Sequence, residues 1–219
     1  MSITYAIADI HGCLAQLSAL STLCLNDAGP EPTNFIFLGD YIDRGPHSAK
    51  VIDFLMNLQA AAPDRVTCLM GNHEDLLLSA VDDPKNEQRW LRNGGTQTLR
   101  SYGASRSTDL PLDHLSWLET LPKFHDDGVR FFVHAGVHPD RPLDQQDEYD
   151  LLYIREPFLS STKDFGRYIV HGHTPIADGS PDQRLNRLNI DTGAVFGRRL
   201  TAAVFTHEAT LPKRFIFSD

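Results

Sequence analysis

The sequence predicts an α/β fold in which layers of strands and helices pack on one another. Short apolar runs that are typical of buried strands alternate with stretches whose apolar residues recur at helical spacing. Polar clusters flanked by glycine follow several of the strand-like runs, where strands of an open α/β sheet present ligand-binding residues. The length of 219 residues predicts one domain spanning 1–219.

The first half of the chain predicts three strands, each followed by a helix. The apolar runs at 3–8, 35–38 and 65–70 are the expected strands, and the third helix is expected to begin near Glu74. This order favours a sheet that is parallel at its start. The apolar positions that predict the first two helices are Leu14, Leu17, Leu20 and Cys24, and then Val51, Ile52, Leu55 and Leu58.

Residues 82–128 differ in character from the rest and are interpreted as a mostly helical insertion. The segment is expected either to lie over a site or to form an ordinary helical layer of the core, and the sequence favours neither. A short amphipathic helix is predicted near 112–121, where leucines recur every third residue. Trp90 is expected to pack in the core rather than to shape a lid.

The second half of the chain returns to strands. They are expected at 129–133, 168–170, 188–190, 200–205 and 215–217. The turn-forming runs DTG and FGRR separate some of the last strands, which are therefore expected to be antiparallel.

Charge and cysteine usage limit the classes of partner. A formal net charge of −9 argues against binding of nucleic acid or an acidic membrane, although positive charge gathered locally still permits a phosphate-bearing substrate. No apolar stretch reaches bilayer-spanning length, and the first residues do not resemble a secretory signal. Three isolated cysteines fit a reduced, cytoplasmic protein better than a disulfide framework. The oligomeric state is not indicated.

Five polar clusters follow strand-like runs and together predict a metal site. Their oxygen and nitrogen donors, without thiolates, suit two divalent ions; manganese is favoured, and iron or zinc also fits. Asp9 and His11 are expected to share one side of an extended segment and so to bind one ion together. The clusters are Asp9-Ile10-His11-Gly12, Gly39-Asp40, Gly71-Asn72-His73-Glu74, His134-Ala135-Gly136 and His171-Gly172-His173-Thr174.

The motifs DIHG, GDYIDRG, GNHE, HAG and GHT, in this order, resemble the signature of metallophosphatases of the phosphoprotein phosphatase family. The small bacterial and bacteriophage serine/threonine phosphatases are the most similar type, with symmetric diadenosine tetraphosphatases as relatives. The resemblance implies a calcineurin-like metallophosphoesterase fold: a central β-sandwich flanked by helices, with a dinuclear metal site at the carboxyl-terminal edge of the strands.

The resemblance also implies a ligand set and a nucleophile. Asp40 would bridge the two ions, and a hydroxide held between them would attack phosphorus directly. The implied ligands are Asp9, His11 and Asp40 for the first ion, and Asp40, Asn72, His134 and His173 for the second.

The rest of the GDYIDRG turn is expected to serve the same reaction. Arg44 offers a planar fork for two phosphate oxygens, and Asp43 is expected to favour the protonated form of His73. His73 would then donate a proton to the leaving alkoxide. Arg155 matches a second phosphate-binding arginine of the phage-type enzymes. His171 is expected to be structural rather than a ligand, because Pro175 occupies the second histidine position of GHxH phosphoesterases.

Three functions are compatible with these residues, and the first is the predicted one. The first is a serine/threonine protein phosphatase that also accepts small phosphate esters. The second is hydrolysis of dinucleoside polyphosphates, which would require extra basic or aromatic residues for the base and the longer phosphate chain. The third is a non-catalytic module that binds phosphorylated partners. For Asp40, Asp43 and Arg44, the alternative is a surface turn with a salt bridge that contributes little to stability.

Overall fold

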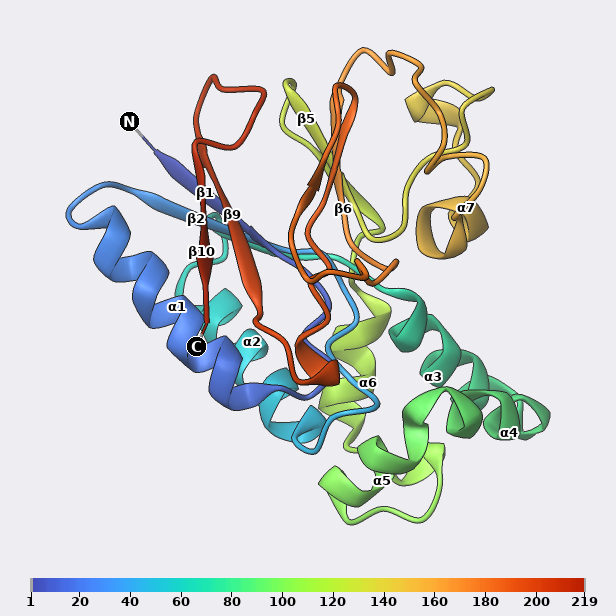
Figure 1. Cartoon of the computed structure of the whole chain (residues 1–219). Coiled ribbons are helices and arrows are strands. Elements are labelled where there is room, and N and C mark those ends of the chain that lie inside the picture. Colours follow the sequence, from blue (N-terminus) through green and yellow to red (C-terminus); the bar gives the residue numbers. More distant parts are fainter. Residues whose placement is uncertain (1, 219) are drawn as a thin grey trace.

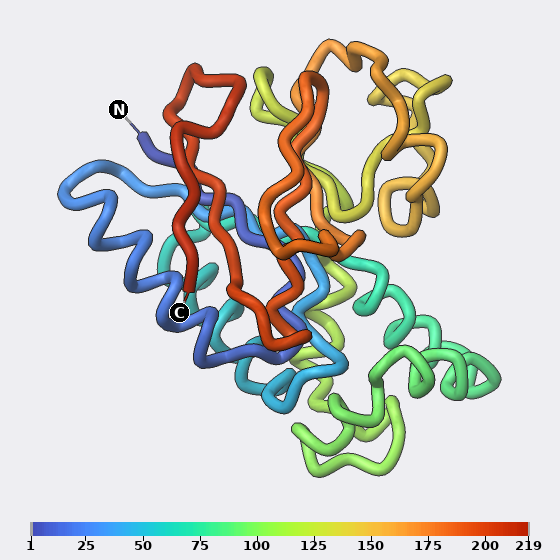
Figure 2. Tube along the Cα trace, in the orientation of Figure 1, coloured from blue at the N-terminus to red at the C-terminus, as the bar shows by residue number. Residues whose placement is uncertain are grey.

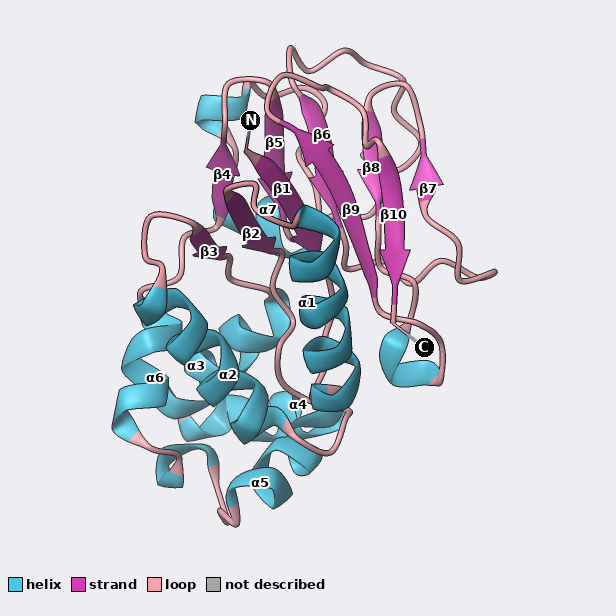
Figure 3. Cartoon of the chain, turned by 90° about the vertical axis from the view of Figure 1, so that its left-hand side faces the viewer, coloured by secondary structure: helices cyan, strands magenta, loops and turns pink. Residues whose placement is uncertain are grey.

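In the computed structural model, which describes residues 2–218, two five-stranded sheets face each other and helices lie outside them (Figure 1). Figure 3 shows the strands gathered in the upper part of the molecule and helices α1 to α6 below. The predicted α/β class and the β-sandwich flanked by helices are therefore confirmed.

The first sheet has the strand order β10-β9-β1-β2-β3. Strands β1, β2 and β3 are parallel, as expected, while β9 and β10 are antiparallel to their neighbours. Figure 2 shows that the N-terminal strand and the C-terminal hairpin lie side by side in this sheet. Its strands are β1 (Ile3–Ile7), β2 (Thr33–Phe37), β3 (Val66–Cys68), β9 (Thr201–Thr206) and β10 (Arg214–Phe217).

The second sheet has the strand order β4-β5-β6-β8-β7, with β5, β6 and β8 parallel. The segments 188–190 and 200–205 had been expected to be antiparallel neighbours, and this prediction is wrong: β8 and β9 belong to different sheets, because residues 191–200 cross between them. The pair β9–β10 is antiparallel as predicted. The strands are β4 (Phe124–Asp126), β5 (Arg130–Val133), β6 (Tyr168–His171), β7 (Asp182–Gln183) and β8 (Arg187–Asn189).

Alternate side chains along β1 point to opposite faces of the sheet and pack in two different hydrophobic cores. Tyr5 and Ile7 pack in the cluster that joins the first sheet to its helices. Ala6 and Ala8 belong to the cluster between the two sheets, together with residues of β6 and β8. Successive side chains of a strand point to opposite faces, so both faces of this sheet are covered and both rows are apolar.

The helices cover the outer faces of both sheets. Side chains of α1, α2, α3 and α6 share a core with the first sheet, and α7 packs on the second. Within residues 2–218, no helix is both long enough and apolar enough to cross a membrane. The helices are α1 (Leu14–Ala28), α2 (Ser48–Ala61), α3 (Asn72–Asp82), α4 (Glu87–Trp90), α5 (Thr96–Tyr102), α6 (Leu112–Glu119) and α7 (Glu148–Tyr153); the short turns are η1 (Pro84–Asn86), η2 (Leu91–Gly95), η3 (Ser107–Asp109), η4 (Leu143–Gln145) and η5 (Ala194–Phe196).

The segment 82–128 is mostly helical and ends in β4, a strand that the sequence did not indicate. Trp90 is fully buried in the core, as expected. The π-helical turn η2 passes against the GDYIDRG turn, where the carbonyl of Gly94 accepts a hydrogen bond from the Arg44 amide (3.2 Å). A Cβ at Gly94 would lie 2.7 Å from that amide nitrogen, so only glycine permits this approach. The segment is thus a helical layer of the core that also contacts the site.

Candidate metal centre and cleft

The predicted ligands meet at the seam between the two sheets. The first sheet contributes residues after β1 and β2 and at the start of α3, and the second contributes residues after β5 and β6. All of these side chains are buried except His173, which is partly exposed. The residues brought together are Asp9, His11, Asp40, Asn72, His134 and His173, with His73 and Asp43 beside them.

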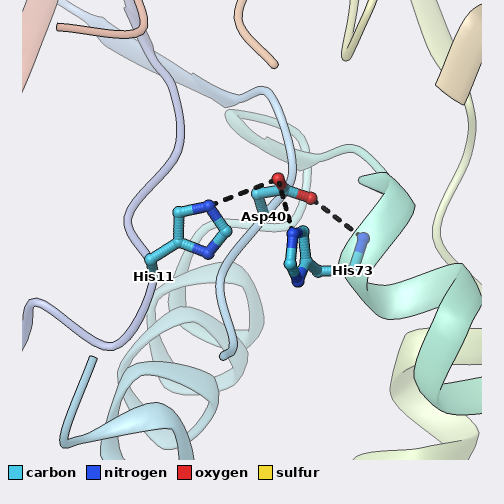
Figure 4. Close-up of side chains that lie close together, drawn as sticks. All are labelled: His11, Asp40 and His73. Atoms are coloured by element: carbon cyan, nitrogen blue, oxygen red, sulfur yellow. Dashed lines mark hydrogen bonds and ion pairs between the residues drawn. The ribbon is translucent and has the colours of Figure 1, made fainter. Parts of the chain in front are cut away.

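Asp40 lies at the centre of this cluster. Its Oδ2 is 3.4 Å from His11 Nε2 and 3.9 Å from His73 Nε2 (Figure 4). Its Oδ1 accepts a hydrogen bond from the backbone amide of His73 (3.0 Å) and lies 3.4 Å from His134 Nε2. Burial opposes ionisation, but the surrounding histidines hold the pKa of Asp40 well below its ordinary value. Asp40 is therefore a carboxylate placed between two groups of histidines.

Two of those histidines are held with a lone pair facing the cluster. His11 Nδ1 donates to the carbonyl of Ile42 (2.7 Å), and His134 Nδ1 donates to the carbonyl of Leu38 (2.9 Å). Burial lowers the pKa of both rings, so they are neutral. A neutral ring that donates from Nδ1 carries its lone pair on Nε2, which is the arrangement of a metal-binding histidine.

The second group of donors brings an amide oxygen and two imidazole nitrogens close together. Asn72 Oδ1 lies 2.9 Å from His134 Nε2 and 2.7 Å from His173 Nδ1, and the two ring nitrogens are 3.2 Å apart. Burial is the main cause that lowers the pKa of His173 to about 3. An amide oxygen and imidazole nitrogens are groups that bind divalent ions. These donors therefore fit a divalent ion.

Asp9 contacts the backbone of His173, whereas it was expected to lie beside His11 on one side of an extended segment. Its carboxylate accepts a hydrogen bond from the His173 amide (2.8 Å) and lies beside the buried Asp191. Burial, with the charges of Asp191 and Asp40, raises the pKa of Asp9 well above its ordinary value. Among residues 2–218, two groups of His and Asp side chains have potential ligand atoms within 4.8 Å of one another, and Asp9 belongs to neither: His11, Asp40 and His73, and then Asp40, His134 and His173.

Asp191 was missed at the sequence level. It belongs to the DTG run, which was interpreted as a turn, and its amide and carboxylate do hold that turn through Asn189 and Gly193. Burial raises its pKa to about 6. Carboxylates buried this close to one another are stabilised by nearby positive charge. The donors and the charges of the cluster together fit two divalent ions.

His73 and Asp43 form a buried pair beside the cluster. His73 Nδ1 and Asp43 Oδ2 are 2.7 Å apart. Asp43 also accepts hydrogen bonds from Thr98 Oγ1 (2.6 Å) and Trp90 Nε1 (3.1 Å), which favour its ionised form, whereas burial raises the pKa of Asp43 above its ordinary value. Burial alone would lower the pKa of His73, but Asp40 and Asp43 raise it above its ordinary value. Thr98 and Trp90 belong to the segment 82–128, and the local sequence did not predict that they contact Asp43.

Glu74 holds the central loops together and was given no role by the sequence. Its carboxylate accepts hydrogen bonds from the backbone amides of Asp40 (2.8 Å), Tyr41 (2.9 Å) and Gly71 (2.9 Å). This reach back to Gly71 also explains why α3 begins at Asn72, two residues earlier than expected. A Cβ at Gly71 would lie 2.3 Å from Asp40 Oδ1, so glycine is required there.

Within residues 2–218, the residues other than glycine that have left-handed backbone conformations all lie at the site. Left-handed conformations of residues other than glycine cost about 1–3 kcal/mol each and persist where the surrounding structure imposes them. Asp9 and His11 are among them, so they reach the cluster through a strained turn after β1 and not through an extended strand, which corrects the expected geometry. Within residues 2–218 these residues are Asp9, His11, Asp40, Asp43, Arg44 and His173.

A cleft of about 490 Å³ opens beside the cluster. Both predicted phosphate-binding arginines line it. Arg44 donates to His11 Nε2 (2.7 Å), and the positive charge of Arg155 contributes to the low pKa of His173. The full lining is Asp40, Arg44, Asn72, Leu76, Arg89, Asn93, Tyr149, Asp150, Tyr153, Ile154, Arg155, Glu156 and His173.

His171 lies outside both groups of candidate ligands. Its ring is in edge contact with Phe158, with centroids 5.0 Å apart, and its Nε2 lies 3.4 Å from an Arg187 nitrogen. Burial lowers its pKa to about 3. These contacts are those of a packed core residue of β6.

Comparisons with known proteins agree with this geometry. The sequence model of the calcineurin-like phosphoesterases matches residues 4–209. The chain is 29% identical to serine/threonine-protein phosphatase 1 of Salmonella typhimurium, over 91% of this chain and 90% of that protein. It is also 29% identical to the asymmetrical bis(5'-nucleosyl)-tetraphosphatase PrpE of Anoxybacillus flavithermus, over 94% and 91%.

Solved structures show the same fold. A crystal structure of a proposed diadenosine tetraphosphatase superposes with a TM-score of 0.71 at 23% identity, covering 99% of this chain and 93% of that one. A metallophosphoesterase from Sphaerobacter thermophilus gives a TM-score of 0.58 at 20% identity, covering 98% and 86%. The fold predicted from the motifs is therefore confirmed.

Proposed function

The chain belongs to the calcineurin-like phosphoesterase family, and from this premise we propose that it hydrolyses phosphate monoesters with two divalent metal ions. The observation that carries the proposal is the buried carboxylate of Asp40 with unprotonated histidine nitrogens on both sides. The proposed ligands are Asp9, His11, Asp40, Asn72, His134 and His173.

The bound ions supply water of lowered pKa and neutralise charge on the phosphate oxygens. Manganese is the proposed metal, because the donors are carboxylate, amide and imidazole groups.

His73 is the proposed proton donor. Asp43 accepts a hydrogen bond from Nδ1, so the proton to be transferred is held at Nε2, the atom that faces Asp40. Donation of this proton to the leaving oxygen lets an alkoxide depart as an alcohol. Arg44 and Arg155 line the same cleft as Asp40 and would hold the phosphate oxygens during the displacement.

The first proposed substrate class is phosphoserine and phosphothreonine in proteins, together with small aryl phosphates. An open cleft that leads directly to the cluster supports it. The named activity of the Salmonella typhimurium relative lends further support. Phosphoserine and phosphothreonine have a poor alkoxide leaving group, which is the case in which a protonated His73 contributes most.

A second candidate is hydrolysis of dinucleoside polyphosphates. One specific observation favours it: the cleft contains a third arginine, Arg89, and an exposed aromatic side chain, Tyr149. These are the extra basic and aromatic groups that such a substrate requires. The relative from Anoxybacillus flavithermus is named for this activity.

A side-by-side assay tests the proposal and separates the candidates. Manganese-loaded protein is expected to hydrolyse p-nitrophenyl phosphate, and its rates on a phosphoserine peptide and on diadenosine tetraphosphate then rank the two substrate classes. Absence of turnover on every one of these substrates, with two ions bound per chain, would instead support a phosphate-binding module without catalysis.

A further inference from the structure

The side chain of Asp43 is inaccessible to solvent, and the segment 82–128 encloses it. Its exposed fraction is 0%. Trp90 and Thr98, which lie 47 and 55 residues further along the chain, both donate hydrogen bonds to its carboxylate. Neither residue belongs to the predicted metal or phosphate-binding set, so the proposed reaction gives them no role so far.

The hydrogen bonds to Asp43 are divided between its two carboxylate oxygens. Oδ1 accepts from Thr98 Oγ1 at 2.6 Å, and Oδ2 accepts from His73 Nδ1 at 2.7 Å. The indole N–H of Trp90 lies 3.1 Å from both oxygens. With Oδ1 bound to Thr98, Oδ2 is the oxygen left for the His73 ring.

Thr98 contacts the backbone of Asp43 as well as its side chain. The amide of Asp43 lies 2.9 Å from Thr98 Oγ1 and 3.1 Å from Ser48 Oγ, and these two hydroxyl oxygens are 3.0 Å apart. Asp43 has a left-handed φ of 70°, a conformation that persists where the surrounding structure imposes it. One hydroxyl group therefore fixes both the backbone and the carboxylate of Asp43.

The surroundings of Trp90 and Thr98 hold both side chains in place. Each is 0% exposed. The backbone at Gly95 packs against the Trp90 indole, where a Cβ would lie 2.5 Å from two ring carbons. Ser101 Oγ accepts a hydrogen bond from the amide of Ala49 (3.0 Å), which joins α5 to the start of α2. The two donors thus approach Asp43 from a packed layer and not from a mobile loop.

The position of Asp43 determines which nitrogen of His73 faces the metal cluster. Nδ1 donates to Asp43, so Nε2 faces Asp40 at 3.9 Å (Figure 4). A carboxylate that rotates, or that shares its oxygens with water, would hold the ring less firmly. Misplacement of a reacting group by about 1 Å can cost about 10²-fold in rate. Proton donation by His73 therefore requires that Asp43 itself be fixed.

We propose that Thr98 and Trp90 are positioning residues for proton donation by His73. They hold Asp43 in the orientation in which Oδ2 receives the Nδ1 proton, and the ring then directs its Nε2 proton toward the leaving oxygen. This inference rests on the proposed function, because it concerns the same reaction. It gives the segment 82–128 a part in the chemistry in addition to its part in the core.

The dependence of the rate on the leaving group tests this role. Thr98→Val removes the hydroxyl, and Trp90→Phe removes the indole N–H. Each is expected to lower kcat on phenyl phosphate, a poor leaving group, by about 10–100-fold. The loss should be much smaller on p-nitrophenyl phosphate, with metal content as in the wild type. Thr98→Ser keeps the hydroxyl and should restore the wild-type ratio of the two rates.

A double variant shows whether the effect passes through His73. Thr98→Val added to His73→Asn is expected to lower kcat on phenyl phosphate no further, because residues that act through one group are not additive. A full further loss would show that Thr98 only satisfies a buried carboxylate, and the inference would be wrong. Two controls should leave the ratio of rates unchanged: Thr96→Val at an exposed position of α5, and Trp117→Phe, which removes an indole N–H bonded to Gln59.

A measurement without substrate separates this inference from the proposed function. In zinc-loaded protein, the Nδ1 proton of His73 is expected to give a low-field NMR signal, identified by its loss in His73→Asn. The signal should shift, or broaden by exchange with water, in Thr98→Val and Trp90→Phe and stay unchanged in Thr96→Val. Unchanged signals in the first two variants would overturn the inference. Absence of hydrolysis by the wild type refutes the proposed function, while the signal still decides whether Thr98 and Trp90 hold the pair.

Discussion

The inner metal cluster and the outer part of the cleft, which Arg89 and Tyr149 line, are built in opposite ways. In the cluster, side chains are buried, the backbone is strained, and atoms such as His11 Nδ1 and His134 Nδ1 are fixed by carbonyl groups. In the outer part, Arg89 is exposed and without an ion pair among residues 2–218, and Tyr149 is 66% exposed. Under the proposed function, the reaction depends on the buried seam between the sheets, whereas the choice of substrate depends on exposed side chains.

This difference explains why two relatives with the same sequence identity to this chain are named for different activities. A serine/threonine phosphatase and a tetraphosphatase are each 29% identical to this chain. Residues that hold two ions and transfer a proton are required for either reaction, because both displace an oxygen from phosphorus. Exposed positions such as Arg89 and Tyr149 change without cost to the core. Motifs in the cluster thus identify the chemistry and leave the substrate open.

The largest effect is expected from Asp40→Asn. The change removes the central negative charge, so the cluster should hold fewer than two manganese ions per chain. Turnover of p-nitrophenyl phosphate should then fall by several orders of magnitude. Elemental analysis and steady-state kinetics measure both quantities. Retention of two ions together with wild-type turnover would show that Asp40 is not the bridging ligand.

His73→Asn is expected to have the next largest effect. Loss of the proton donor should lower kcat on a phosphoserine peptide by about 10²–10⁴-fold. The loss should be smaller on p-nitrophenyl phosphate, whose leaving group departs without a proton. Metal content should stay near that of the wild type. An equal loss on both substrates would contradict a role in protonating the leaving group.

Asp43→Asn is expected to shift the pH profile. Because Asp40 and Asp43 raise the pKa of His73 against the effect of burial, the active protonated ring is present below that pKa and is lost as pH rises through it. Without the charge of Asp43 the pKa falls, so the alkaline limb of kcat/KM for a phosphoserine peptide should move to lower pH. An unmoved limb would mean that this limb reports another group.

The smallest of these effects is expected from Glu74→Gln, and it concerns stability. The carboxylate oxygens accept amide protons from both central loops, and the amide nitrogen of glutamine would face such donors. An unsatisfied buried donor costs about 1–3 kcal/mol in the free energy of unfolding. Urea denaturation measures the difference, with exposed Glu119→Gln as the control. Equal midpoints for the two variants would refute the role of Glu74 in joining the loops.

Local sequence was sufficient to predict much of the fold and of the cluster. Apolar periodicity located the strands of the first sheet, and polar residues directly after strands identified Asp40, Asn72, His134 and His173 as neighbours. Parallel strands bring their carboxyl ends to one edge, so a pattern along the chain becomes a cluster in space. Periodicity did not separate β8 from β9, because a short apolar run does not specify its partner strand.

Other features were decided only by tertiary structure. Trp90 and Thr98 contact Asp43 from 47 and 55 residues away, so no local pattern connects them. Asp191 reaches Asp9 because residues after β8 cross to the first sheet. The sequence by itself determined the class of fold and the donors available for metal. Long-range packing decided which buried groups tune those donors and which exposed residues face the substrate, because contacts between distant segments depend on how whole elements pack.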